Sequence, residues 1–182
     1  MSLRVLLVGS GGREHALAWK LSQSPLISHI FAVPGNGGTA SIDKVKNVTS
    51  VNQDDFAGLL KYAIDEDVRL LVPGPEAPLV DGITDYFEEH APGRIKVFGP
   101  SKAAARMEGS KAFSKEFMKR HNIPTASYET FTEHDQAKTH LDSVYTDRSA
   151  GGIKVVIKAS GLAAGKGVSP PSHPACVAIY LV

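Results

Sequence analysis

Strand-like runs alternate with helix-like segments along the first hundred residues, and this alternation restricts the fold more than any other feature of the chain. Short apolar runs predict strands at residues 4–8, 30–33, 68–72 and 95–98. Apolar residues at helical spacing predict helices near residues 14–21, 56–63 and 80–89. Asn52 is a candidate N-cap for the second of these helices. Strands that alternate with helices predict βαβ units, a parallel sheet and an α/β fold.

Each predicted strand ends in a loop rich in glycine, proline or polar residues. These loops cover residues 9–14, 34–38, 73–76 and 99–101. Ligands of parallel α/β sheets bind beyond the carboxyl ends of the strands. The four loops are therefore where a site is expected.

The pattern changes after Pro100, where a second domain is expected to begin. Residues 101–120 are mostly helical, with a break near Gly109 and Ser110 as a candidate cap. Strands are predicted at 127–131 and 153–157, with a helix at 133–142 between them. Three prolines interrupt the last residues, 169–182, whose short apolar end is expected to pack as an edge strand.

Composition excludes several classes of function. The net charge is +1, from 20 Lys and Arg against 19 Asp and Glu, so no basic surface for nucleic acid or membrane is expected. Trp19, Phe113 and Phe117 are interpreted as core residues rather than a base-stacking platform. No metal-ligand spacing is present among the histidines. A single cysteine and no signal-peptide pattern indicate a cytoplasmic protein without disulfides.

The first glycine-rich turn, Gly9-Ser-Gly-Gly-Arg-Glu-His15, follows a strand and opens a helix. Such a helix start favours an anion. The dinucleotide fingerprint G-x-G-x-x-G fails, because Glu14 occupies its sixth position, and no acid follows the second strand. A monophosphate is thus favoured over NAD, and a purely structural turn is the alternative.

For two further loop residues, ligand binding and an ordinary role in a turn explain the sequence equally well. Glu76 lies at a predicted strand end, where its carboxylate would accept hydrogen bonds from ribose hydroxyls or an amine. A solvated turn acid is the alternative. Asn36 is explained equally well by turn chemistry without a ligand.

A second glycine-rich segment begins at Lys158 and carries Lys166 between two glycines. Two lysines eight residues apart, beside a loop whose glycines turn N–H groups toward an anion, favour a polyphosphate. Lys158 ends an apolar strand, and a buried lysine needs an anionic partner, so a ligand is favoured over a structural salt bridge. Lys111 follows a candidate helix cap, where a phosphate partner or solvent exposure fits. The segment departs from the Walker pattern at Ser160 and Gly167.

In this order along the chain, the motifs resemble those of the phosphoribosylamine–glycine ligases (glycinamide ribonucleotide synthetases), a family of ATP-grasp enzymes. The resemblance runs from residue 1 to about residue 168. The segments that carry it are Val8-Gly-Ser-Gly-Gly-Arg-Glu-His15, Pro34-Gly-Asn-Gly37, Gly74-Pro-Glu76, Phe98-Gly-Pro100, Ser110-Lys111, Ile123-Pro-Thr125 and Lys158-Ala-Ser-Gly-Leu-Ala-Ala-Gly-Lys-Gly-Val168.

The resemblance implies a reaction and its participants. ATP, with Mg²⁺ or Mn²⁺, phosphorylates the carboxylate of glycine, and the amine of 5-phosphoribosylamine attacks the glycyl phosphate. The products are glycinamide ribonucleotide, ADP and phosphate, in the second step of de novo purine synthesis. Expected partners are small molecules, with fusion to later purine enzymes in some longer forms.

The resemblance also implies site residues. Those expected to bind 5-phosphoribosylamine are Gly9, Gly11, Gly12, Arg13, Glu14, Asn36 and Glu76. Those expected to bind ATP are Lys111, Lys158, Gly161, Gly165, Lys166 and Gly167. Lys158 and Lys166 are the expected catalytic residues, and no metal ligand is expected in this chain.

The implied fold is a parallel-sheet, Rossmann-like preATP-grasp domain followed by an incomplete ATP-grasp domain. The expected boundaries are 1–100 for the first domain, 101–125 for a helical linker that starts the ATP-grasp fold, 126–168 for part of its small subdomain, and 169–182 for a divergent tail.

Metal ligands and the glycine pocket are expected beyond this chain. A truncated, inactive form is therefore expected, from a natural truncation or an incomplete gene model. The alternatives are a non-catalytic sugar-phosphate-binding remnant, a partner of the full-length ligase and, remotely, an NAD-dependent dehydrogenase.

Overall fold

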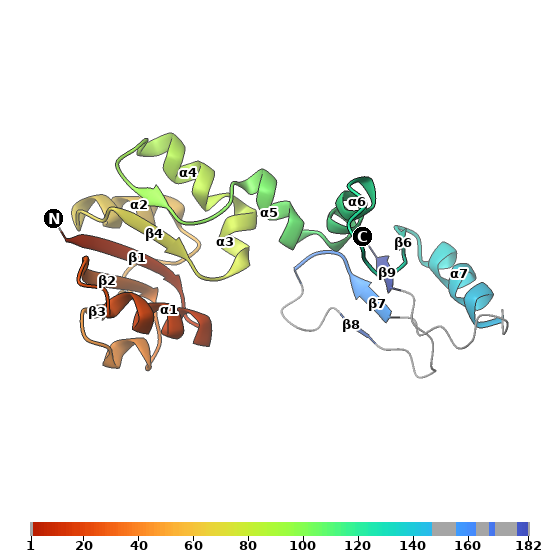
Figure 1. Ribbon diagram of the computed structural model, residues 1–182, viewed down its shortest axis with the longest axis horizontal. Coiled ribbons are helices and arrows are strands. Elements are labelled where there is room, and N and C mark those ends of the chain that lie inside the picture. Colours follow the sequence, from red (N-terminus) through yellow and green to blue (C-terminus); the bar gives the residue numbers. More distant parts are fainter. Residues whose placement is uncertain (1, 147–155, 163–167, 170–177, 182) are drawn as a thin grey trace. The chain divides into compact units, whose positions relative to one another are not determined.

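The protein divides into two compact units, Met1–Ala105 and Arg106–Val182, each built from helices and a sheet (Figure 1). The computed structural model describes residues 2–146, 156–162, 168–169 and 178–181. Among these residues, no helix is both long and apolar enough to cross a membrane.

The first unit is built on a five-stranded parallel sheet of order β3-β2-β1-β4-β5. The strands are β1 (Leu3–Gly9), β2 (Ile27–Pro34), β3 (Val45–Asn47), β4 (Leu70–Pro73) and β5 (Lys96–Val97). The helices are α1 (Gly12–Ser22), a 3-10 turn η1 (Thr39–Ser41), α2 (Phe56–Asp65), α3 (Glu76–Asp81) and α4 (Ile83–His90). Helix α5 (Lys102–Gly109) begins in this unit and crosses its boundary at Ala105. The alternation of strands and helices predicted from the sequence is confirmed.

Apolar side chains fill both faces of this sheet because successive strand residues point to opposite sides. On one face, Leu6 and Val8 of β1 pack in a cluster that includes Phe87 of α4 and Leu59 of α2. On the other face, a second cluster contains Val5 of β1 together with Ala18 of α1. Figure 1 shows α1 on one side of the sheet and α2 and α4 on the other. This doubly covered arrangement explains the continuous apolar run of β1.

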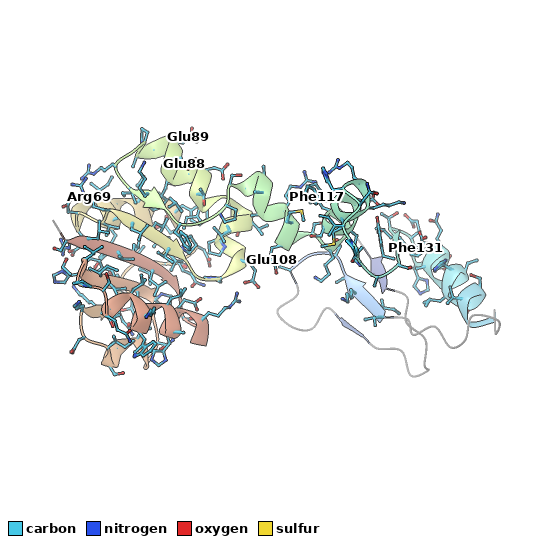
Figure 2. All side chains as sticks on the ribbon, viewed as in Figure 1. Arg69, Glu88, Glu89, Glu108, Phe117 and Phe131 are labelled. Atoms are coloured by element: carbon cyan, nitrogen blue, oxygen red, sulfur yellow. The ribbon has the colours of Figure 1, made fainter. Side chains whose placement is uncertain are left out.

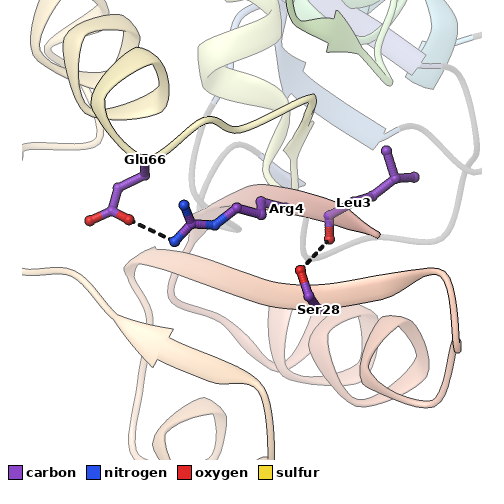
Figure 3. Close-up of polar contacts among 4 residues, drawn as sticks. All are labelled: Leu3, Arg4, Ser28 and Glu66. Atoms are coloured by element: carbon purple, nitrogen blue, oxygen red, sulfur yellow. Dashed lines mark hydrogen bonds and ion pairs between the residues drawn. The ribbon is translucent and has the colours of Figure 1, made fainter. Parts of the chain in front are cut away.

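Polar contacts close the end of the sheet opposite the predicted site. Arg4 of β1 pairs with Glu66, which follows α2, at 2.9 Å, and the Ser28 hydroxyl donates to the Leu3 carbonyl at 3.3 Å (Figure 3). On the outer side of α4, Glu88 and Glu89 are exposed (Figure 2).

Some local expectations for this unit were wrong. Asp55, not Asn52, caps α2 by accepting from Gly58 N–H at 3.0 Å, while Asn52 accepts from Asp54 N–H in a turn. The helix expected at 80–89 is split at Gly82, whose φ of 101° ends α3 and lets the chain restart as α4.

None of the three aromatic residues expected in the core is buried. Trp19 is 57% exposed, whereas Ala18 beside it is fully buried. Neighbouring residues on a helix point about 100° apart, so only one of the two faces the sheet. Phe113 and Phe117 are half-buried.

The second unit has a four-stranded sheet of order β6-β9-β7-β8. Its elements are α6 (Lys111–Arg120), β6 (Tyr128–Phe131), α7 (His134–Thr146), β7 (Val156–Ala159), β8 (Val168–Ser169) and β9 (Ala178–Leu181). Phe131 of β6, Leu141 and Val144 of α7 and Ile157 of β7 form a partly buried apolar cluster. The cap predicted at Ser110 is confirmed, since its hydroxyl accepts from Phe113 N–H at 3.2 Å.

The edge strand expected at the end of the chain is instead an interior strand. β9 pairs in parallel with β6 on one side and with β7 on the other.

Candidate functional site

The carboxyl ends of β1 and β4 form the topological switch point of the first unit. From β1 the chain passes to β2 on one side, and it later returns to β4 on the other side. Connections leave the two neighbouring strands in opposite directions, which opens a crevice between their loops. All seven residues expected to bind the sugar phosphate lie just at or after the carboxyl ends of β1, β2 and β4, in the loops there or in the first turns of α1 and α3.

The loop after β2 is tied to the first glycine turn. The Asn36 side-chain amide donates to the carbonyls of Ser10 and Gly11, at 2.9 and 3.1 Å. In addition, Gly35 N–H donates to the Gly9 carbonyl at 3.2 Å. Asn36 therefore fixes the backbone of the first turn, whether or not it also touches a ligand.

The loop after β4 is tied to the same turn by a charged pair. The Arg13 guanidinium, on the first turn of α1, lies 2.9 Å from a Glu76 carboxylate oxygen at the start of α3. The side chains are 69% and 35% exposed, so both remain accessible to a ligand. A hydrogen bond from the Glu76 backbone and then the Arg13 side chain hold the pKa of the Glu76 carboxyl below its usual value.

The Arg13–Glu76 ion pair is lost when Glu76 becomes protonated at low pH, and this loss can be measured. Because the folded-state pKa of Glu76 is lowered, its contribution to stability is present above the unfolded pKa and is lost as pH falls through the folded pKa. A carbon-13 NMR titration of the Glu76 carboxyl should show a midpoint below the usual pKa of a glutamate side chain. In Arg13→Gln, the Glu76 midpoint should rise. An unchanged midpoint would show that the pair does not form in solution.

Glu14 lies beneath this surface rather than on it. It is 3% exposed, and one carboxylate oxygen accepts from Gly11 N–H at 2.5 Å. The structure shows what the residue that breaks the dinucleotide fingerprint does. In that fingerprint the third glycine permits close helix–strand packing, whereas Glu14 fills this space with its side chain, against Gly9 and Gly74.

The second unit brings together some of the residues expected to bind ATP. Lys111 Nζ donates to the Gly161 carbonyl at 2.9 Å, and Lys111 N–H donates to the Ser160 carbonyl at the same distance. Lys158 lies on β7, two residues before Ser160. The beginning of the glycine-rich loop is thus bonded to the start of α6. Gly165, Lys166 and Gly167 lie outside the described residues.

The hydrogen bonds at the start of α6 decide what this helix end can bind. The N–H of Ala112 donates to Ser160 Oγ at 3.2 Å, and Phe113 N–H donates to Ser110 Oγ at the same distance. With Lys111 N–H also satisfied, these helix-terminal donors are taken by the protein. Any anion here would be bound by lysine side chains rather than by the first backbone N–H groups of α6.

Lys115, in the same unit, has a pKa that is affected by burial and by the charge of Lys158. Burial, and then the positive charge of Lys158, lower the pKa of Lys115 below its usual value. Lys115 Nζ donates to Thr125 Oγ1 and the Ala126 carbonyl, at 2.6 and 2.9 Å. Among the residues that the structure describes, no three His, Cys, Asp or Glu side chains are grouped closely enough to hold a metal ion.

Two family models match the chain. The phosphoribosylglycinamide synthetase N domain matches residues 3–108, and the ATP-grasp (A) domain of the same synthetase matches residues 109–179. The chain belongs to the phosphoribosylglycinamide synthetase family. The resemblance inferred from the ordered motifs is confirmed.

Relatives within this synthetase family agree over nearly the whole chain. Phosphoribosylamine–glycine ligase from Haemophilus influenzae is 51% identical over 166 residues, which are 91% of this chain and 36% of the ligase. The bifunctional purine biosynthetic protein PUR2,5 of Pichia angusta is 54% identical over 175 residues, which are 94% of this chain and 20% of that protein. The chain therefore spans about a third of the bacterial ligase and a fifth of the bifunctional protein.

Solved structures agree on the fold. Phosphoribosylamine–glycine ligase from Thermotoga maritima has a TM-score of 0.58 and 29% identity, with 92% of this chain and 36% of that chain covered. N5-carboxyaminoimidazole ribonucleotide synthetase from the same organism has a TM-score of 0.59, covering 92% of this chain and 40% of that chain, but at 18% identity it shows the fold alone. The parallel sheet of the first unit is that of a preATP-grasp domain.

Two polar residues that shape these synthetase loops were missed from the sequence. Ser160 is 4% exposed and joins the glycine-rich loop to α6. Asn47, on β3, donates to the Asn36 carbonyl at 2.7 Å. A serine directly before the first glycine of the glycine-rich segment was the available signal for Ser160. No signal pointed to Asn47, because β3 was not predicted.

Proposed function

We propose that this chain supplies the 5-phosphoribosylamine-binding domain and part of the ATP-binding domain of a phosphoribosylamine–glycine ligase. The observation that carries the proposal is the convergence of the loops after β1, β2 and β4 at one switch point, in a chain about half identical to such ligases. The proposed reaction joins glycine to 5-phosphoribosylamine and converts ATP to ADP and phosphate.

The proposed chemistry has two balanced steps. A glycine carboxylate oxygen attacks the γ-phosphorus of ATP, which forms glycyl phosphate and releases ADP. The amine of 5-phosphoribosylamine then attacks the acyl carbon, phosphate leaves, and the nitrogen loses a proton to give glycinamide ribonucleotide. Cations beside the phosphates stabilise the charge that develops during transfer.

The residues of the first unit suit the sugar phosphate. The start of α1 offers the positive end of a helix and the Arg13 guanidinium for the 5-phosphate. Glu76, with its lowered pKa, is ionised at neutral pH and suited to accept hydrogen bonds from ribose hydroxyls or from the amine. Gly9, Gly11, Gly12, Glu14 and Asn36 would shape the turn that receives the ligand.

The residues of the second unit suit ATP. Lys111 and Lys158 would contact its phosphates, and the loop that begins at Gly161 and contains Lys166 would cover them. The magnesium or manganese ion that accompanies ATP would be held by acidic residues outside the described part of this chain. When bound, such an ion neutralises phosphate charge.

Arginine replacement tests the sugar-phosphate site. Arg13→Ala should weaken the binding of ribose 5-phosphate by roughly 10- to 100-fold, because a hydrogen bond to a charged group contributes about 1.5–3 kcal/mol. Isothermal titration calorimetry on the purified chain measures this. Arg69→Ala is the matched control, since Arg69 also pairs with a carboxylate at 2.9 Å but lies before β4. Equal Kd values for the two variants would refute the assignment.

A non-catalytic sugar-phosphate-binding protein, acting alone or with the full-length ligase, is the second candidate. It is favoured by the first unit, which contains all the proposed sugar-phosphate residues by itself. We expect a polypeptide of these 182 residues to bind ribose 5-phosphate but to form no glycinamide ribonucleotide, since it spans 36% of a bacterial ligase. If the chain formed glycinamide ribonucleotide from glycine, ATP–Mg²⁺ and 5-phosphoribosylamine, the non-catalytic candidate would be refuted.

A further inference from the structure

Glu14 is the only charged side chain among the buried residues that the structure describes. Its carboxylate is enclosed by the backbone of two loops. A Cβ added to Gly9 would lie 2.7 Å from its Cδ, and one added to Gly11 would lie 2.9 Å from its Oε2. A Cβ on Gly74 would overlap its Oε1. Three glycines therefore leave the room that this carboxylate fills.

The bonding of this carboxylate is incomplete. Oε2 accepts from Gly11 N–H, whereas Oε1 is buried and has no hydrogen-bond partner among the described residues. A buried carboxylate with an unpartnered oxygen is unfavourable for folding. Departures of this kind concentrate where a function needs them. The bond from Gly11 N–H caps the start of α1 and gives Glu14 one structural role. That role uses only Oε2 and does not account for the burial of Oε1 against Gly74.

The two loops that enclose Glu14 also carry the exposed charged pair. Gly9 and Gly11 belong to the turn that leads into Arg13, and Gly74 belongs to the loop that leads into Glu76. The Glu14 carboxylate lies between the two loops, and the Arg13–Glu76 bond of 2.9 Å spans them. Their separation therefore depends on a group of the size of the glutamate side chain.

We infer that Glu14 is a positioning residue that sets the separation of the Gly9–Gly11 turn and the Gly74–Glu76 loop, and thereby the placement of Arg13 and Glu76. It acts through the backbone of both loops and does not touch the ligand. Its effect on sugar-phosphate binding rests on the proposed function, whereas its effect on the Arg13–Glu76 pair does not.

The pKa of Glu76 separates positioning from simple electrostatics. Glu14→Ala removes a negative charge, and by Coulomb's law alone this would lower the pKa of Glu76 further. If Glu14 holds the loops apart, its removal lets them shift, Arg13 moves away, and the pKa of Glu76 rises. The two explanations predict opposite signs.

The experiment combines carbon-13 NMR titration of Glu76 with calorimetric titration of ribose 5-phosphate on the whole chain. For Glu14→Ala we expect a higher Glu76 pKa and a Kd raised at least tenfold. Glu88→Ala, which removes an exposed glutamate of α4 (Figure 2), is the charge-matched control and should change neither quantity. A folded Glu14→Ala protein with an unchanged or lower Glu76 pKa would overturn the inference.

Gly74→Ala is the second variant and keeps Glu14 in place. Its methyl group would overlap Oε1, so the loops should again shift, the Glu76 pKa should rise and the Kd should increase at least tenfold. In Glu14→Ala/Gly74→Ala the methyl group enters vacated space, and the second substitution should change the Kd less than threefold. Additive effects of the two substitutions would overturn the inference. If the wild-type chain does not bind ribose 5-phosphate, the proposed function fails while the Glu76 titrations still decide the role of Glu14.

Discussion

Replacing Phe87 by alanine should lower the free energy of unfolding of the first unit by about 3–5 kcal/mol. Phe87 is fully buried on α4 and belongs to the larger apolar cluster, beneath the face of the sheet that α2 and α4 cover. Removal of its ring loses the transfer free energy of the side chain and leaves a cavity that the surrounding side chains fill only partly. Urea denaturation followed by far-ultraviolet circular dichroism measures the loss.

Phe98→Ala is the matched control for this substitution. Phe98 lies in the same unit but is 75% exposed, so its truncation should change the free energy of unfolding by less than about 0.5 kcal/mol. Equal losses for the two variants would mean that α4 does not cover the sheet as described.

The organisation of the first unit could be predicted because its strands are continuous apolar runs. β1, β2 and β4 are each buried on both faces, so sequence alone located them. β3 escaped prediction because it has three residues and one apolar side chain, Val45. The parallel sheet was predictable, but the strand order was not predicted. The interior position of β9 was missed because it depends on pairing with β6 and β7, which lie many residues away in the chain.

The candidate site, too, was predictable from the sequence in part only. Loops that follow neighbouring parallel strands must meet at one edge of the sheet, so the meeting of the Gly9 turn with Glu76 was predictable. Sequence could not show that Glu14 is buried, because its neighbour Gly74 is 60 residues away in the chain. Likewise, the partners of Ser160 at the start of α6 lie about 50 residues before it. Local patterns locate loops, and only the tertiary fold decides which side chains in them face a ligand.

Replacing Gly9 by alanine should have the largest effect on binding. Gly9 has a φ of 126°, which residues with a Cβ rarely adopt, and the added Cβ would lie 2.7 Å from Glu14 Cγ and 2.9 Å from Pro75 Cδ. Backbone strain costs about 1–3 kcal/mol, and overpacking adds roughly 1–3 kcal/mol. We expect an unfolding free energy lowered by about 2–6 kcal/mol and a Kd for ribose 5-phosphate raised at least 100-fold.

Gly37→Ala distinguishes a specific effect from a general intolerance of these loops to alanine. Gly37 lies in the loop after β2, its φ is not positive, and an added Cβ would meet no atom within 4 Å. Its replacement should leave both quantities near their wild-type values. Binding is measured at 10 °C, after circular dichroism shows that each variant is folded. A folded Gly9→Ala protein with wild-type affinity would show that the first turn tolerates distortion, and it would remove that turn from the proposed site. Loss of binding in the folded variant would instead support the turn as part of the site, through its own backbone or through the placement of Arg13 and Glu76.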